Sequence, residues 1–177
     1  MTRSTLVRAG GVAAIAGGAL RAAASFAPLV IDSIVERESL YILVDLCLTI
    51  GLLGFSARHS KSIGWLGATG LALALVGLVT VRANRAISTV DLYPAGALAT
   101  ACGVILLSAR VWVARRIPGW VPVAFLISTF VGLLGSYLRG ANSLLVCSGV
   151  IFGVAFVGLG GEMWRSPGEV PGQPTSR

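Results

Sequence analysis

The chain has 177 residues, of which 55% are apolar and 12% charged, and its mean hydropathy is +0.86. Soluble domains carry about 25% charged residues, so this composition excludes an ordinary soluble protein and predicts a membrane protein. The formal net charge of +7 comes from basic residues scattered along the chain, without the basic stripe typical of nucleic-acid binding, so we expect no nucleic-acid partner.

Six stretches are long and apolar enough to cross a bilayer as helices, because a hydrocarbon core about 30 Å thick needs roughly 20 helical residues. They predict an all-α membrane protein, with a bundle of six transmembrane helices in residues 1–164. The expected spans lie near residues 9–30, 40–57, 63–81, 92–109, 117–138 and 143–163. Residues 165–177 contain three prolines and little apolar surface, which predicts a disordered cytoplasmic tail.

The first span, near residues 9–30, has an alternative interpretation. A basic start, a short apolar run and the sequence Ala22-Ala23-Ala24 resemble a secretory signal peptide with a small-residue cleavage site. Arg21 lies in the wrong place for such a site and the run is rich in glycine, so we expect a retained helix. Cleavage would leave five spans and an N-terminus outside the cell.

Two ionisable residues fall inside predicted spans, Arg21 in the first and Asp45 in the second. A charge inside the bilayer costs about 2.5–3.5 kcal/mol, so each is a candidate for a functional role. At 1.5 Å per residue their depths differ by only about 6 Å, and adjacent antiparallel helices would let them form an ion pair. Three roles stay open: a structural clamp, Arg21 reaching to the membrane surface, or a proton or substrate site with Asp45 as the acceptor.

His59, the only histidine, falls in the turn after the second span and is expected to be solvated. A single histidine in a loop leaves a three-histidine metal site and an in-membrane serine–histidine dyad without their parts. The sequence also contains no glycine-rich phosphate loop, no H-E-x-x-H and no C-x-x-C motif. We therefore expect no enzymatic activity, no cofactor and no metal site.

Small residues spaced four apart predict close helix packing in three spans, because helices in lipid associate through close backbone approach. The pairs are Ala13 and Gly17, Ala99 and Gly103, and Gly149 and Gly153. We expect these faces to build the interior of the bundle. The alternative is contact with a partner membrane protein or with a second copy of the chain.

The second half of the chain resembles the first at offsets of 81 and 86 residues. Gly51-Leu52-Leu53-Gly54 aligns with Gly132-Leu133-Leu134-Gly135, and Ala13 and Gly17 align with Ala99 and Gly103. With three spans in each copy, such a duplication would produce two inverted three-helix repeats, a plan common among transporters. The other interpretation is chance matching between segments rich in alanine, glycine and leucine.

Basic loop residues predict the orientation, because positively charged loops stay in the cytoplasm. Nine basic residues fall on the side of the two termini and four on the other, which predicts a plasma-membrane protein with both termini cytoplasmic. The aromatic residues agree: Trp65, Trp112, Trp120 and Trp164 fall at inner span ends, and Tyr41, Tyr93 and Tyr137 at outer ends. The composition resembles that of small alanine- and glycine-rich proteins of bacterial inner membranes.

Two functions follow as hypotheses. The first is a non-enzymatic structural or accessory membrane subunit that presents its small-residue faces to partner helices. The alternative is a small transporter, or a substrate-binding transporter subunit, with its site near Arg21 and Asp45.

Overall fold

The computed structural model describes residues 3–83, 92–138 and 141–164, so the predicted tail at 165–177 lies outside the described residues. The described residues form the helices α1 (Arg3–Ala24), α2 (Ala27–Val30), α3 (Ile34–Arg58), α4 (Ser60–Ala83), α5 (Tyr93–Val113), α6 (Trp120–Tyr137) and α7 (Asn142–Glu162). All except the short α2 contain segments long and apolar enough to cross a membrane. The prediction of an all-α membrane bundle with six spanning helices is confirmed.

Two helices differ most from the predicted spans, and a local cause explains where α1 ends and where α3 begins. The predicted span near residues 9–30 is α1 over residues 3–24, and α3 begins at Ile34 instead of near residue 40. A helix continued through Pro28 would press the proline ring against the carbonyl of Ala24, so α1 ends there and Pro28 lies in the first turn of α2. Ser33 starts α3 early, because its side chain accepts a hydrogen bond from the Glu36 backbone N–H at 3.4 Å.

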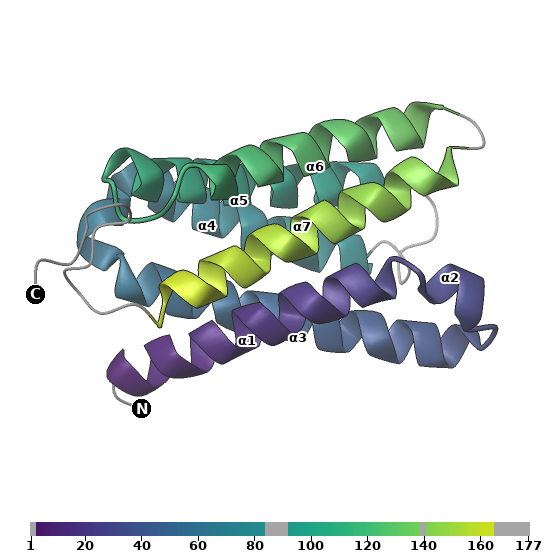
Figure 1. Ribbon diagram of the computed structural model, residues 1–177, viewed down its shortest axis with the longest axis horizontal. Helices are drawn as coiled ribbons and strands as arrows, with labels where there is room; N and C mark the ends of the chain where they lie inside the picture. The colour runs from purple at the N-terminus through teal and green to yellow at the C-terminus, as the bar shows by residue number, and fades with distance from the viewer. Residues whose placement is uncertain (1–2, 84–91, 139–140, 165–177) are drawn as a thin grey trace, which may run out of the picture.

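The six long helices follow one another around the bundle in chain order, and α7 closes the ring by packing on α1 (Figure 1). Contacts are extensive between α1 and α3, α1 and α7, α6 and α7, and α4 and α5. They are much sparser between α3 and α4 and between α5 and α6. The bundle therefore consists of a helix pair, α4 and α5, and a four-helix group, α1, α3, α6 and α7.

The two ends of the bundle differ in their connections. The turn between α3 and α4 and the connection between α5 and α6 lie at the end where α1 begins and α7 ends, on the left in Figure 1. This end is termed the His59 end, and the opposite one, where α4 ends, the Arg82 end. Exposed Trp65, Trp112, Trp120 and Trp164 belong to the His59 end, and exposed Tyr93 and Tyr137 to the Arg82 end. This separation suits side chains that prefer the boundary between water and hydrocarbon.

α1 packs closely on two neighbours because it contains two pairs of adjacent glycines, one heptad apart. In the first pair, Gly10 meets Gly54 of α3 and Gly11 faces Trp164 after the end of α7. One heptad later, a Cβ on Gly17 would lie 2.8 Å from the Cβ of Cys47 on α3, and a Cβ on Gly18 would overlap α7. Neighbouring residues on a helix point about 100° apart, so each pair places one glycine toward α3 and one toward α7.

The small residues predicted at helix contacts occupy two kinds of position. A Cβ would collide with a neighbouring helix or the segment after it at four of them, Gly17, Gly103, Gly149 and Gly153. The other two, Ala13 and Ala99, are only half-buried. Beside them, Ala14 makes the close contact with Gly51, and Thr100 the one with Gly77. The glycine faces are therefore occupied inside the bundle.

Hydroxyl groups add a second link between α6 and α7. Ser128 Oγ donates to the carbonyl oxygen of Ser148 at 2.9 Å, and Ser148 Oγ donates to the carbonyl oxygen of Ser128 at 2.8 Å. Interhelical hydrogen bonds in membranes contribute about 0.6 kcal/mol on average. This reciprocal pair reinforces the packing of α6 on α7.

The packing does not reproduce the predicted repeat. The alignment pairs α1 with α5 and α3 with α6, yet α1 packs extensively on α3 whereas α5 and α6 touch little. The two inverted three-helix repeats stay a hypothesis.

Candidate functional site

Three side chains with useful chemistry share one face of α3 toward the Arg82 end. Glu38, Tyr41 and Asp45 are spaced three and seven residues apart, which places them on successive turns of the same face. Glu38 belongs to this face only because α3 starts at Ile34. The predicted start near residue 40 had left it in a loop.

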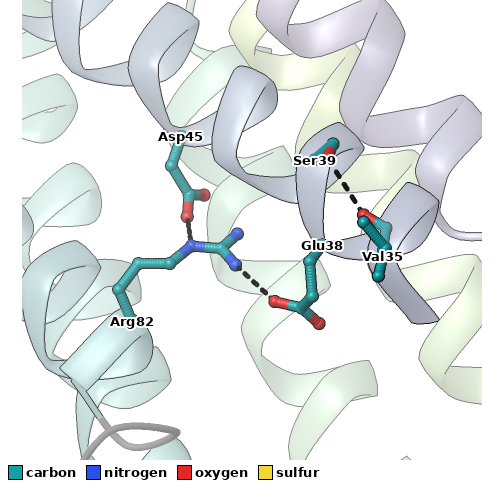
Figure 2. Close-up of polar contacts among 5 residues, drawn as sticks. All are labelled: Val35, Glu38, Ser39, Asp45 and Arg82. Atoms are coloured by element: carbon teal, nitrogen blue, oxygen red, sulfur yellow. Dashed lines mark hydrogen bonds and ion pairs between the residues drawn. The ribbon is translucent and has the colours of Figure 1, made fainter.

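Arg82, in the last turn of α4, forms ion pairs with both carboxylates (Figure 2). Its Nε donates to Oδ2 of Asp45, and its Nη1 donates to Oε2 of Glu38 at 3.5 Å. The side chains of Arg82, Glu38 and Asp45 are 29%, 27% and 21% exposed. The cluster therefore joins the helix pair to the four-helix group where their contact is sparse.

Tyr41 connects this cluster to a third helix. Its ring centroid lies 5.8 Å from Cζ of Arg82, within the range of a cation–π interaction. Its hydroxyl donates to the carbonyl oxygen of Ala24 at 3.5 Å, at the end of α1. Glu38, Tyr41, Asp45 and Arg82 are referred to below as the Arg82 cluster.

The structure corrects the predicted partner of Asp45. Arg21 and Asp45 interact electrostatically at longer range, but the described residues contain no ion pair between them, and Asp45 binds Arg82 instead. The guanidinium of Arg21 lies beside α7, with its Cζ 3.8 Å from the place a Cβ on Gly149 would take. Similar depth in the membrane does not predict an ion pair, because the two side chains can point in different directions around their helix axes.

The Arg82 cluster has two chemical capacities. One guanidinium holds both carboxylates, so moving Arg82 away leaves two negative charges without a counter-charge in a partly dehydrated place. The cluster can thus hold α3 against α4 as a clamp. It can also take up a proton or a cation on a carboxylate when Arg82 moves away.

His59 is buried, which corrects the expectation of a solvated loop residue. It is only 7% exposed, because α3 ends at Arg58 and α4 starts at Ser60, which leaves His59 alone in a tight turn. Its Nδ1 donates to the carbonyl oxygen of Phe55 at 3.1 Å, and the two rings lie 4.5 Å apart. Burial is the main reason that the pKa of the imidazole falls from 6.5 to about 4, so His59 is neutral at pH 7.

This burial predicts a stability that depends on pH. Between pH 6.5 and about 4 the unfolded chain protonates His59 while the folded chain does not, so stability is present above pH 6.5 and is lost as the pH falls. The free energy of unfolding is expected to drop by about 3 kcal/mol across this window from His59 alone. Melting temperatures of the wild type and His59→Gln in detergent between pH 4 and 7.5 test this. Equal slopes for the two proteins would contradict it.

Comparisons with protein-family models, curated proteins and solved structures found no match.

Proposed function

We propose that this protein is a small non-enzymatic transporter, or a substrate-binding transporter subunit, in which Asp45 accepts a proton or a cation and Arg82 regulates its charge. The observation that carries the proposal is the position of Asp45 at the boundary between two separately packed groups of helices. Transporters bind ions and substrates between two such groups, and they work by moving one group against the other.

The sparse contact between α3 and α4 supports this assignment. The main neighbours of α3 and α4, which are α1 and α5, contact them extensively, whereas the two facing helices touch little and are joined by the ion pairs of the Arg82 cluster. A contact made of charged side chains can be broken by protonation, while an apolar contact cannot. Asp45 is therefore suited to couple occupancy of the site to movement of α4 and α5.

The accessory-subunit hypothesis is the second candidate, and α6 favours it. This helix packs extensively on α7 alone, and its outer surface has a shallow apolar groove lined by Leu126, Ile127, Thr129, Phe130 and Leu133. A partner helix would find its contact there, because the glycine faces are already used within the bundle. Loss of partner binding on Phe130→Ser, while Asp45→Asn still binds the partner, would favour this candidate.

We propose that both termini are cytoplasmic, in line with the charge of the two ends. At the His59 end the described chain has the basic residues Arg3, Arg8, Arg58, Lys61, Arg110, Arg115 and Arg116 against Glu162. At the Arg82 end it has Arg21, Arg37 and Arg82 against Asp32, Glu36, Glu38 and Asp45. The positive end is the one that stays inside the cell.

Proton movement in proteoliposomes tests the transporter proposal. Liposomes with an entrapped pH-sensitive dye are challenged with a panel of amino acids, amines and monovalent cations. We expect one of these compounds to drive a pH change in the wild type and Asp45→Asn to abolish that change. The substituted amide keeps an oxygen for the Arg82 hydrogen bond but cannot bind a proton at physiological pH, so the protein is expected to stay folded.

Asp32→Asn is the matched control, because it makes the same chemical change at an exposed residue before α3. It should transport as the wild type does. The proposal is wrong if Asp45→Asn transports at the wild-type rate, or if the folded wild type moves none of the panel compounds.

A further inference from the structure

The His59 end carries three arginines that the fold does not use for ion pairing. Arg110, Arg115 and Arg116 are exposed, and none of them pairs with a carboxylate within the part of the chain that the structure describes. Three guanidinium groups this close in sequence repel one another unless an anion or counter-ions neutralise them. Their positive charge is therefore available to an external anion.

The fold brings these arginines together with the start of α4. The guanidinium of Arg110 lies beside Gly64, with Nε and Nη2 3.8 and 3.9 Å from the place of a Cβ. Gly64 has a φ of 58° and interrupts the regular helix of α4. Arg115 and Arg116 follow shortly after the end of α5, five and six residues beyond Arg110.

The backbone at the end of α5 holds the other two arginines at the surface. Arg115 adopts a left-handed conformation with a φ of 54°, and the N–H of Arg116 donates to the carbonyl of Val111 at 3.1 Å. This is the hydrogen-bond pattern of a Schellman motif, which ends a helix in a defined geometry. The chain thus fixes both arginines, although the left-handed backbone at Arg115 would cost glycine less energy.

Two exposed tryptophans place the arginines at the depth of lipid headgroups. Trp65 follows Gly64 directly and is 76% exposed, and Trp112, in the last turn of α5, is 47% exposed. Tryptophan prefers the interface between hydrocarbon and water, where phosphates of the lipid headgroups also lie. Lipid phosphates are therefore the anions that lie at the same depth as Arg110, Arg115 and Arg116.

We propose that Arg110, Arg115 and Arg116, flanked by Trp65 and Trp112, bind the headgroup of an anionic phospholipid. Guanidinium groups bind phosphate oxygens in a bidentate manner, and the flanking rings lie along the upper part of the acyl chains. A zwitterionic lipid brings its own cation to the site, so the three arginines select against it. This inference is independent of the transporter proposal.

Quenching of tryptophan fluorescence by brominated lipids tests the proposal on the full chain. Trp120 and Trp164 are changed to phenylalanine so that only Trp65 and Trp112, which flank the arginines, report. Brominated phosphatidylglycerol is expected to quench Trp65 and Trp112 more strongly than brominated phosphatidylcholine at equal lipid fractions. Removing Arg115 and Arg116 with glutamine substitutions is expected to lower the relative binding constant about fivefold for each arginine.

Arg37→Gln is the control, because it removes one positive charge from the opposite end of the bundle. It should leave the quenching of Trp65 and Trp112 unchanged. Equal quenching by the two lipids in the wild type would overturn the proposal, as would an equal loss in Arg37→Gln. Competition by inorganic phosphate at constant ionic strength would assign the site to free phosphate and overturn the lipid assignment.

Discussion

Gly153→Leu is expected to separate α1 from α7 and to lower the free energy of unfolding by more than about 3 kcal/mol. A Cβ on Gly153 would overlap the carbonyl oxygen of Gly18 and lie 2.9 Å from the backbone nitrogen of Ala22. Both neighbours are backbone atoms of α1, so no side-chain rotation makes room and the helices must move apart. Unfolding by a denaturing detergent, followed by circular dichroism, measures the loss.

Gly161→Leu is the matched control on the same helix. No atom lies within 4 Å of the place a Cβ on Gly161 would take, and the residue is exposed. The same chemical change there is expected to alter the free energy of unfolding by about 0.5 kcal/mol or less. If both variants unfold like the wild type, α1 and α7 do not pack as closely as described.

Arg82→Met is expected to cost about 2 kcal/mol or more, because it leaves Glu38 and Asp45 facing each other without a counter-charge. The partial exposure of these side chains keeps the loss below the 3–5 kcal/mol typical of a fully buried pair. Methionine retains an apolar stem, so the measurement reports the lost charge and hydrogen bonds. Adding Asp45→Asn to Arg82→Met should recover part of the loss, since one of the two unbalanced charges is then gone.

Arg37→Met serves as the control for charge removal at the same end of the bundle. Arg37 lies in the first turn of α3 and takes no part in the Arg82 cluster. Its substitution is expected to change stability by about 0.5 kcal/mol or less. Equal melting temperatures for Arg82→Met and Arg37→Met would show that the ion pairs do not hold α3 against α4.

The spanning helices were predictable from sequence because apolar length is a direct requirement of the bilayer. The ends of the helices depend on local signals that apolar length does not contain. Ser33 and Glu36 have the S-x-x-E spacing of a capping box, which marks the start of α3, and Pro28 marks a break after α1. Hydropathy averages over many residues and therefore passes over such single-residue signals.

Of the candidate site, only the role of Asp45 as an intramembrane charge was predictable from sequence. The cost of an intramembrane charge drew attention to Asp45 correctly as a residue that needs a partner. Its partner was missed because the predicted span ended at Val81, directly before Arg82, so Arg82 was placed in a loop. A long arginine side chain at a helix end can reach back toward the membrane interior, which extends its reach beyond the span itself.

The buried state of His59 could not be predicted from the same pattern. A polar residue between two apolar spans is usually solvated. The imidazole of His59 instead folds back on α3, where it donates to the carbonyl oxygen of Phe55 and packs on the Phe55 ring. These contacts depend on the direction of one side chain, which hydropathy and loop length do not determine.

The contact between α1 and α7 also constrains how the protein is made. α1 leaves the ribosome long before α7, so the glycines that face α7 stay against lipid until that helix has been inserted. Closure of the ring is consequently a late step of biogenesis that follows membrane insertion of the other helices. A nascent chain arrested before α7 would expose a half-packed α1 in the bilayer, where membrane chaperones and proteases recognise incomplete assemblies.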